Sequence, residues 1–312
     1  MDQTNGTLLE HFVLKGFPGN HVLQKIIFVA LLVAYLITMA GNLLIIVIVY
    51  SDHRLHSPMY LFLVCLSFTD LLMVSFVIPK LLAVLVEEKT ISKMGCFIQS
   101  YLYYFITTAD ILILTVMSID RFVAICYPLR YSYIMRNSIC IKLVIGCFIT
   151  PFLLLLYPTV TIPNFPFCGH VVLDHFFCDS AAMLSLVCVD TRLIKLATII
   201  NSVFILIIPL IITSISYIFI VSTVIKMRST KGHHKTFSTC VSHLTMVCIV
   251  FGSAIFIEVR ASKCYSVETD KTVNFVSTIL GPLLNPFIYT LRNKKVKDCL
   301  RDKEKWKELL TH

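Results

Sequence analysis

The sequence predicts an all-α membrane protein, a bundle of seven transmembrane helices with its N-terminus outside the cell. Three observations predict it: long apolar runs, a scarcity of charge, and basic residues gathered on one side of the runs. Of the 312 residues, 57% are hydrophobic and 14% are charged, whereas soluble domains carry about 25% charged residues. The apolar runs are Ile26–Tyr50, Met59–Pro79, Phe97–Ile119, Leu143–Pro163, Leu196–Ile225, Phe237–Ile257 and Thr272–Leu291.

Each run is long enough to cross a hydrocarbon layer of roughly 30 Å as a helix, which takes about 20 residues. Because lipid offers the backbone no hydrogen-bond partners, each run must satisfy its own backbone groups, as a helix does. We expect one domain, with an extracellular tail over residues 1–25, a seven-helix unit over residues 26–291 and a cytoplasmic tail over residues 292–312. The cytoplasmic tail should begin with a short amphipathic helix from about residue 293 to 304, lying against the lipid surface.

The basic residues set the orientation. With the N-terminus outside, segments 51–58, 120–142, 226–236 and 292–312 are cytoplasmic, and they hold 17 of the 27 Lys and Arg residues against six acids. The outer segments hold ten basic and ten acidic residues. An excess of Lys and Arg on the cytoplasmic side is the usual bias of membrane proteins. The net charge of +9 therefore indicates a cytoplasmic leaflet and a cytoplasmic partner, not nucleic acid.

The N-terminal segment and the cysteines agree with this orientation. Residues 1–24 are polar, and the first apolar run is too long for a signal-peptide core, so we expect no cleavable signal peptide. Asn5, in Asn5-Gly6-Thr7, is a glycosylation acceptor on the outer tail. Four of the 12 cysteines lie at the outer mouth of the third run and in the long outer loop 164–195, where disulfides are permitted. These four cysteines, which allow three pairings, are Cys96, Cys168, Cys178 and Cys188.

Polar residues inside the first three runs are functional candidates, because ionisable groups at this depth are costly. Asn42 lies near the middle of the first run, Asp70 in the middle of the second and Asp110 in the middle of the third. One face of the third helix, read at helical spacing, runs from a polar and aromatic outer end to an arginine at the cytoplasmic edge. Its members are Tyr103, Thr107, Asp110, Leu114, Met117 and Arg121.

The sixth apolar run contains a histidine, and the seventh contains a proline that interrupts its helical hydrogen bonding. His243, near the cytoplasmic end of the sixth run, is interpreted as a hydrogen-bonded core residue. In the seventh run Asn285-Pro286 interrupts the helical hydrogen bonding, with Tyr289 one turn below. We expect the carboxyl and amide groups of the first, second, third and seventh helices to converge around water or a cation.

Two other readings of these polar groups remain open. They act as hydrogen bonds between helices, as polar residues in membranes often do, or as a carboxylate pair of the glycosidase type. The second reading is disfavoured because nothing near the pair supplies a hydrated substrate cleft. The sequence contains no zinc-ligand spacing, nucleotide-binding loop or nucleophile elbow. We therefore expect no enzyme activity, cofactor or metal centre.

Several long motifs resemble those of olfactory receptors, a branch of the rhodopsin-like (class A) G-protein-coupled receptors. The motifs are Leu55-His56-Ser57-Pro58-Met59-Tyr60, Met117-Ser118-Ile119-Asp120-Arg121-Phe122-Val123-Ala124-Ile125-Cys126-Tyr127-Pro128, Lys235-Thr236-Phe237-Ser238-Thr239-Cys240-Val241-Ser242-His243-Leu244 and Pro282-Leu283-Leu284-Asn285-Pro286-Phe287-Ile288-Tyr289. They follow one another in the family's order from residue 55 to 292. Pro79-Lys80 and Lys89-Thr90-Ile91-Ser92 are similar to the tetrapod-type (class II) group.

This chain departs from the family pattern at three positions. Phe122 replaces the usual tyrosine after Asp120-Arg121, Asp110 replaces a glutamate, and Phe251 replaces a tyrosine before Gly252. These changes put the basal activity and the details of the helix-six switch in question.

The resemblance implies disulfide pairings and a ligand site. It implies Cys96–Cys178 and Cys168–Cys188, with Cys96–Cys188 as the competing pairing. It also implies a small, volatile, mostly apolar ligand in the outer halves of helices three, five and six, in an enclosed cavity with a few polar groups. The expected ligand-binding residues are Tyr103, Tyr104, Thr107, Thr108, Asn201, Ser202, Ile205, Phe251, Ile255 and Glu258. Ordinary packing is the alternative role for any one of them.

The resemblance further implies signalling to a heterotrimeric G protein of the olfactory stimulatory type, which raises cyclic AMP, from the plasma membrane of olfactory cilia. At rest Arg121 should pair with Asp120 and contact the region of His243. The expected coupling residues are Asp120, Arg121, His243, Asn285, Pro286 and Tyr289, and the expected intramembrane polar site is Asn42, Asp70 and Asp110.

Two competing functions were weighed. A seven-helix transporter should show inverted repeats with broken helices in two halves, and neither is present in the sequence. A metabolite chemosensor outside the nose would share the receptor architecture, and the sequence does not distinguish it from an odorant receptor. The sequence also leaves the ligand, the tissue and the oligomeric state open.

Overall fold

The computed structural model describes residues 10–17, 19–168, 172–226, 230–261, 267–292, 296–299 and 301–302. For residues 230–239, 242, 258–261, 267, 270 and 290–292 it describes the backbone alone. The expected glycosylation site at Asn5, the end of the C-terminal tail and the side chain of Glu258 therefore lie outside the description.

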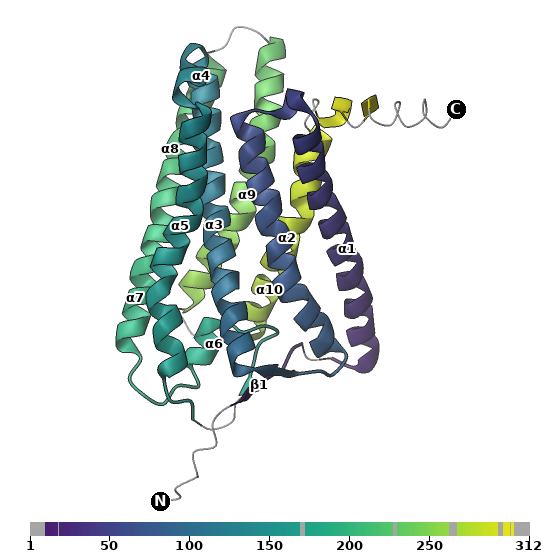
Figure 1. Ribbon diagram of the computed structural model, residues 1–312, viewed down its shortest axis with the longest axis vertical. Helices are drawn as coiled ribbons and strands as arrows, with labels where there is room; N and C mark the ends of the chain where they lie inside the picture. The colour runs from purple at the N-terminus through teal and green to yellow at the C-terminus, as the bar shows by residue number, and fades with distance from the viewer. Residues whose placement is uncertain are drawn as a thin grey trace, which may run out of the picture.

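Long helices running side by side make up most of the described chain (Figure 1). Each apolar run of the sequence lies within one of seven long helical units. These units are α1 (His21–Ser51), α2 (Pro58–Leu85), α3 (Lys93–Cys126), α5 (Asn137–Thr161) with η3 (Ile162–Asn164), α7 (Arg192–Ser202) with η4 (Val203–Ile207) and α8 (Ile208–Ile225), α9 (Thr230–Ala261) and α10 (Val267–Arg292).

Four of the units are long and apolar enough to cross a membrane by length and composition: His21–Ser51, Pro58–Leu85, Asn137–Asn164 and Arg192–Ile225. They expose many large hydrophobic side chains, as helices in lipid do. α3, α9 and α10 are not in this set, and the described apolar part of α9, His243–Ile257, is shorter than a membrane span. α3 lies inside the bundle and contacts α2, α5, α8 and α9, so its polar groups face protein rather than lipid.

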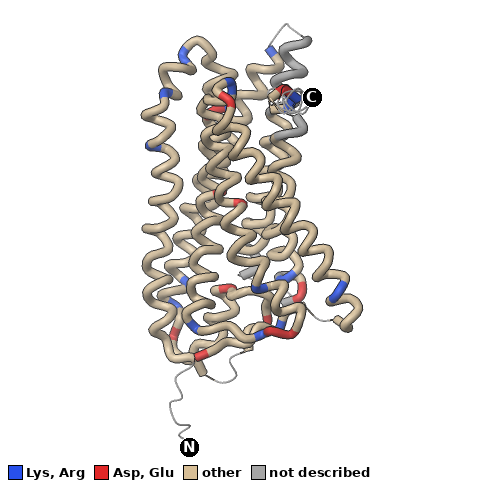
Figure 2. The backbone as a smooth tube through the Cα atoms, turned by 45° about the vertical axis from the view of Figure 1, so that its right-hand side comes forward, with Lys and Arg blue, Asp and Glu red and all other residues tan. Residues whose placement is uncertain are grey.

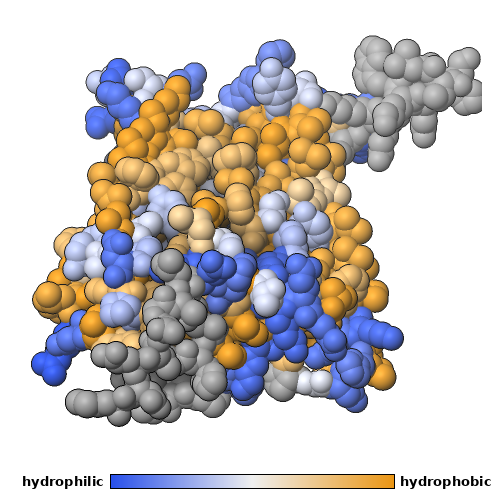
Figure 3. All heavy atoms as spheres, turned by 60° about the horizontal axis from the view of Figure 1, so that its bottom comes forward, coloured by the Kyte–Doolittle hydropathy of each residue, from blue (hydrophilic) through white to orange (hydrophobic). Residues whose placement is uncertain are grey.

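Short elements close the two ends of the bundle. At one end, the sheet end, β1 (His11–Leu14) pairs antiparallel with β2 (Thr90–Ser92) and parallel with β3 (Val172–Leu173), and α6 (Ser180–Leu184) lies beside them (Figure 1). At the other end, the α4 end, lie η1 (His53–Leu55), η2 (Pro128–Arg130) and α4 (Tyr131–Ile134). Charged residues gather at these two ends (Figure 2). The sheet end is mostly hydrophilic, and hydrophobic side chains cover the flanks (Figure 3).

The segment expected as the N-terminal tail, residues 1–25, contains the strand β1 and the first residues of α1. Phe12 and Leu14 alternate along β1 and are both fully buried. They pack in one cluster with Cys96 and Cys178. Because alternate residues of a strand face the same side, two apolar residues at this spacing are enough to fix the strand on the bundle.

Hydrogen-bonding side chains begin the helices, and prolines bend them. Asn20 caps α1 by accepting from the Leu23 amide, and Ser92 caps α3 by accepting from the Gly95 amide. α2 continues past Pro79 to Leu85, beyond the end of the apolar run. Gln99 Nε2 of α3 donates to the Phe76 carbonyl, three residues before Pro79 (3.0 Å), which joins α3 to α2 near the proline.

Candidate functional site

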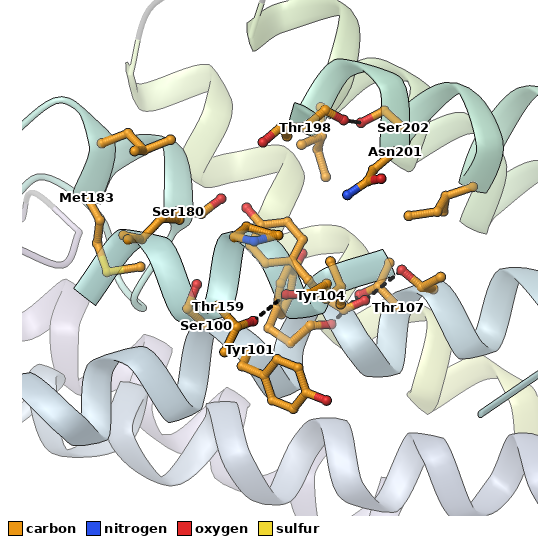
Figure 4. Close-up of a pocket in the computed structure, with 18 of the residues that line it drawn as sticks. Ser100, Tyr101, Tyr104, Thr107, Thr159, Ser180, Met183, Thr198, Asn201 and Ser202 are labelled. Carbon is orange, nitrogen blue, oxygen red and sulfur yellow. Dashed lines mark hydrogen bonds between the residues drawn. The ribbon is translucent and has the colours of Figure 1, made fainter. Parts of the chain in front are cut away.

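A cavity of about 140 Å³ lies in the half of the bundle nearest the sheet end. α3 forms one wall, α5 with η3 a second and α7 with η4 a third, while α9 contributes Ala254 and Ile257. The short helix α6 covers it through Ser180, Met183 and Leu184 (Figure 4). The lining is mostly apolar and holds no charged side chain among the described residues.

The buried carboxylate of Asp179 holds α6, the helix that covers the cavity, against α3. Asp179 is 3% exposed and accepts from the Ala182 amide at the start of α6 (2.9 Å). Its second oxygen accepts from the hydroxyl of Tyr104 on α3 (2.7 Å). The neighbouring Cys178 is disulfide-bonded to Cys96 at the start of α3. The cover is therefore joined to α3 both covalently and by a charge-assisted hydrogen bond.

Both disulfides match the pairings that the resemblance implies. Cys96 bonds Cys178, with 5.3 Å between their Cα atoms, and Cys168 bonds Cys188, with 5.7 Å. The competing pairing Cys96–Cys188 is absent from the structure. The other described cysteines are free, and most of them are buried or half-buried.

Most of the expected ligand-binding residues line this one cavity. These residues are Tyr103, Tyr104, Thr107, Thr108, Asn201, Ser202 and Ile205. Figure 4 shows Thr107 on one side of the cavity, opposite Thr198, Asn201 and Ser202. Ile205 belongs to η4, a π-helical turn, and single π turns inside α-helices often occur at functional sites.

Phe251 and Ile255 are not part of the cavity lining, which corrects that expectation. Phe251 is 2% exposed and packs in the central core with Met246 and Val247. The face of α9 that meets the cavity carries Ala254 and Ile257 instead. The three-residue spacing of that pair was visible in the sequence, but the rotation of the helix depends on packing against α3 and α10.

Two groups of lining residues were missed from the sequence. One is the cover, Ser180, Met183 and Leu184; the other is α5 and η3, with Leu155, Pro158, Thr159 and Ile162. The position of α6 over the cavity could have been predicted from the disulfide. Because Cys178 is bonded to Cys96 at the start of α3, the residues that follow Cys178 must lie above that helix. α5 carries only apolar residues, hydroxyls and prolines at the cavity, so its sequence gave no signal of a site.

A second cavity of about 60 Å³ lies next to the first, and Tyr103, Thr107, Ala254 and Ile257 line both. It holds Asp70, Asp110 and Asn285, three of the residues expected to converge. Asn285 Nδ2 donates to Asp70 Oδ2 (2.7 Å). No group of three or more His, Cys, Asp or Glu residues suited to a metal ion occurs in the described part of the chain.

Asn42 does not join this cluster, which corrects its expected role. Its Nδ2 donates to the Pro282 carbonyl on α10 (3.0 Å) and to the Thr38 carbonyl of its own helix (3.1 Å). In an α-helix the residue-282 carbonyl would accept from the residue-286 amide, but Pro286 has no N–H. Asn42 therefore supplies the missing donor.

The expected coupling residues lie toward the α4 end. Arg121 pairs with Asp120 (3.3 Å), which also accepts from the hydroxyl of Tyr131 on α4 (2.7 Å). His243 is hydrogen-bonded to the hydroxyl of Tyr217 on α8. Among the described residues, the buried hydroxyl of Tyr289 has no hydrogen-bond partner. α10 continues as a helix through Pro286.

An ion cluster ties the sheet end to α10. Lys271 is 1% exposed, and its Nζ lies 2.6 Å from Asp174 and 3.2 Å from Glu268. Lys15 also approaches Asp174 (3.4 Å). The ammonium of Lys271 holds the pKa of Asp174 below its ordinary value. A lowered pKa means that this tie is complete at neutral pH and weakens only in acid.

Comparisons with known proteins agree across nearly the full length. A model of the olfactory receptor family matches residues 31–304. Human olfactory receptor 6T1 is 46% identical over 310 residues, covering 99% of this chain and 96% of that protein. Human olfactory receptor 6J1 is 45% identical over 292 residues, covering 93% and 84%. Human olfactory receptor 6X1 is 41% identical over 298 residues, covering 95% and 96%.

Proposed function

The chain belongs to the olfactory receptor family of rhodopsin-like G-protein-coupled receptors, and we propose that its 140 Å³ cavity is the odorant site. Membership of this family makes the chain a membrane receptor and not an enzyme. The observation that carries the proposal is the cavity between α3, α5 and α7, whose lining is mostly apolar, holds no charged side chain among the described residues and includes a few polar groups. Ligand sites for small molecules have this character.

The odorants that fit are small. Apolar protein cavities of roughly 150 Å³ accept a molecule the size of benzene, and this cavity is of similar volume. Tyr104, Thr107, Thr108, Asn201, Ser202 and Ile205 touch the ligand, with Tyr103 at the boundary with the second cavity. Phe251 and Ile255 affect binding indirectly, by packing against the residues that line the cavity. Glu258 belongs to the outer edge of the cavity.

The sheet end faces outward and the α4 end faces the cytosol. Two disulfides lie at the sheet end, and the segments assigned to the α4 end carry most of the basic charge. Residues 1–25 then form the outer segment with Asn5 as its glycosylation site, residues 26–291 the seven-helix unit and residues 292–312 the cytosolic tail. Val296 and Cys299 of that tail are helical and buried against α1 and α2. The receptor works in the plasma membrane of olfactory cilia.

Odorant binding favours an arrangement in which α9 moves outward at its cytosolic end, because a ligand shifts an equilibrium only by binding one state better. Arg121 leaves Asp120 and, with Tyr289, meets the olfactory stimulatory G protein, which raises cyclic AMP. Leu129 on η2, next to Arg130, is fully exposed and offers an apolar contact for the same partner. The second cavity, with Asp70, Asp110 and Asn285, connects the odorant cavity to this end and holds water or a small cation.

The test is the substitution Arg121→Ala in cells that contain the olfactory G protein. We expect the odorant-evoked cyclic AMP response to disappear, because the Asp120 pair and the G-protein contact both depend on this guanidinium. Surface expression should stay near the parent level. Lys142 is exposed near the start of α5, at the α4 end of the bundle. Lys142→Ala is therefore the matched control, and its cyclic AMP response should equal that of the parent receptor. An undiminished cyclic AMP response of the Arg121 variant would contradict the proposed role of Arg121 in coupling to the G protein.

A further inference from the structure

The polar groups of the odorant cavity are not equivalent as hydrogen-bonding partners. Four hydroxyls, two on α3 and two on α7, each donate to the backbone carbonyl four residues earlier in their own helix. We call these four hydroxyls together the acceptor wall. The four residues are Thr107, Thr108, Thr198 and Ser202, with distances of 2.8, 2.8, 2.9 and 2.9 Å. A hydroxyl has one proton and two lone pairs. These oxygens can therefore accept from a ligand but have no free proton to give it.

Among the other donors, the hydroxyls of Tyr103 and Tyr104 and one N–H of Asn201 are engaged, while the second N–H of Asn201 has no acceptor among the described residues. Asn201 Nδ2 donates to the Leu154 carbonyl on α5 (2.8 Å). That carbonyl faces Pro158, which has no N–H, so it accepts only from Asn201, and the amide must point its nitrogen there. The Tyr104 hydroxyl donates to Asp179 (2.7 Å), and the Tyr103 hydroxyl donates to Asn274 on α10 (3.2 Å).

The cavity also offers nothing to balance a charge. The nearest described carboxylate, Asp179, is not part of the lining, and both of its oxygens already accept hydrogen bonds. A charged ligand would lose its hydration without gaining a counter-charge, which costs far more than a hydrogen bond returns.

We infer that the cavity selects neutral odorants that donate a hydrogen bond, alcohols and phenols, over odorants of the same skeleton that only accept one, such as ketones and ethers. This rests on the proposed function of the cavity. A ketone can accept from the second N–H of Asn201, but it gains nothing from the acceptor wall, whose hydroxyl protons already bond their own helices. An alcohol can accept from the same N–H and also donate to the acceptor wall, which makes one hydrogen bond more. Ser180 lies on the side of the cavity toward Met183 (Figure 4), and Ser100 and Tyr101 lie about two turns before Thr107 and Thr108 on α3.

The experiment uses pairs of odorants that share a skeleton: cyclohexanol with cyclohexanone, benzyl alcohol with benzaldehyde, and 1-hexanol with pentyl methyl ether. Concentration–response curves for cyclic AMP are recorded at matched surface expression. In each responding pair we expect the alcohol to act at about a tenfold lower concentration, about 1.4 kcal/mol, which is the size of one net hydrogen bond. Equal potency, or greater potency of the carbonyl compound or ether, would overturn the inference.

Two variants locate the preference. Thr107→Val keeps the shape and removes the acceptor, and Ser202→Ala removes a second; together they should reduce the alcohol preference to less than about threefold. The ratio of two odorants on one variant does not depend on how well that variant folds. Thr161→Val removes an identical hydroxyl-to-carbonyl bond outside the cavity and should keep the full preference. A double variant that also keeps it would contradict the assignment.

The outcomes separate this inference from the proposed function. A receptor that responds to carbonyl compounds but not to alcohols remains an odorant receptor and refutes only the ligand class. A well-expressed receptor that responds to no odorant of any class refutes the proposed function, and the ligand class with it.

Discussion

Two asparagine side chains donate hydrogen bonds to backbone carbonyls that prolines leave without their helical donor. Asn42 of α1 donates to the Pro282 carbonyl, and Asn201 of α7 donates to the Leu154 carbonyl. In both cases the residue four positions later is a proline, Pro286 or Pro158, which lacks the N–H that a helix would supply. An unpaired carbonyl in lipid is costly. These side chains therefore hold α1 to α10 and α5 to α7.

Replacing Asn42 by alanine should destabilise the receptor. The Pro282 carbonyl would lose its donor in the buried interior, which we expect to cost about 1–2 kcal/mol. In thermal unfolding of the purified receptor, Asn42→Ala should lower the Tm by several degrees. Asn164→Ala is the control, because Asn164 is exposed and bonds only the Val160 carbonyl one turn before it. Equal Tm values for the two variants would contradict this role of Asn42.

The sequence singled out both asparagines as candidates, and neither of these hydrogen bonds was among the roles it predicted. Asn201 was expected at the ligand site and lines the cavity. Asn42 was expected beside Asp70 and Asp110 and instead bonds α10. A proline and the carbonyl it leaves unpaired can be found in one helix by counting back four residues. Which neighbouring side chain reaches that carbonyl depends on helix rotation, which a single sequence does not fix.

At the scale of elements, α1 and α10 pack closely at one glycine. A Cβ built on Gly41 would lie 2.8 Å from Cβ and 2.9 Å from Cγ of Pro286. A proline ring has little freedom to move, so the helices themselves would have to separate. The close contact depends on the absence of a side chain at residue 41.

Gly41→Ala should therefore destabilise the receptor although alanine is the better helix former. We expect a loss of about 1–3 kcal/mol, typical of overpacking, seen as a lower Tm and reduced surface expression. Gly146→Ala in α5 is the matched control. Nothing lies within 4 Å of a Cβ at Gly146, so this substitution should leave stability equal or slightly higher. If Gly41→Ala behaved like Gly146→Ala, the close packing would be refuted.

The long helices were predictable from the sequence and the short elements were not. Runs of about 20 apolar residues specify helices in lipid with little help from tertiary structure. β1 is four residues long, and its three-stranded sheet forms only because β2 and β3 are brought to the same end. α6 has five residues, and Asp179 and the Cys178 disulfide fix its position. Such elements depend on contacts distant in sequence.

At the scale of the whole molecule, the fold divides its polar groups by depth. The odorant cavity lies toward the sheet end, the carboxylates Asp70 and Asp110 line a second cavity beside it, and the Asp120–Arg121 pair lies near α4. Tyr103 and Thr107 belong to both cavities. The two cavities therefore share part of their walls, and a ligand placed in the first would contact residues that also line the second.

The most direct test of this account is a structure of the receptor determined with an activating odorant and its G protein by electron cryomicroscopy. We predict ligand density between α3, α5 and α7 beneath α6, against Thr107 and Ser202, with the G protein bound at the α4 end beside Arg121. Ligand density outside this cavity, or a G protein bound without contact to Arg121, would contradict it.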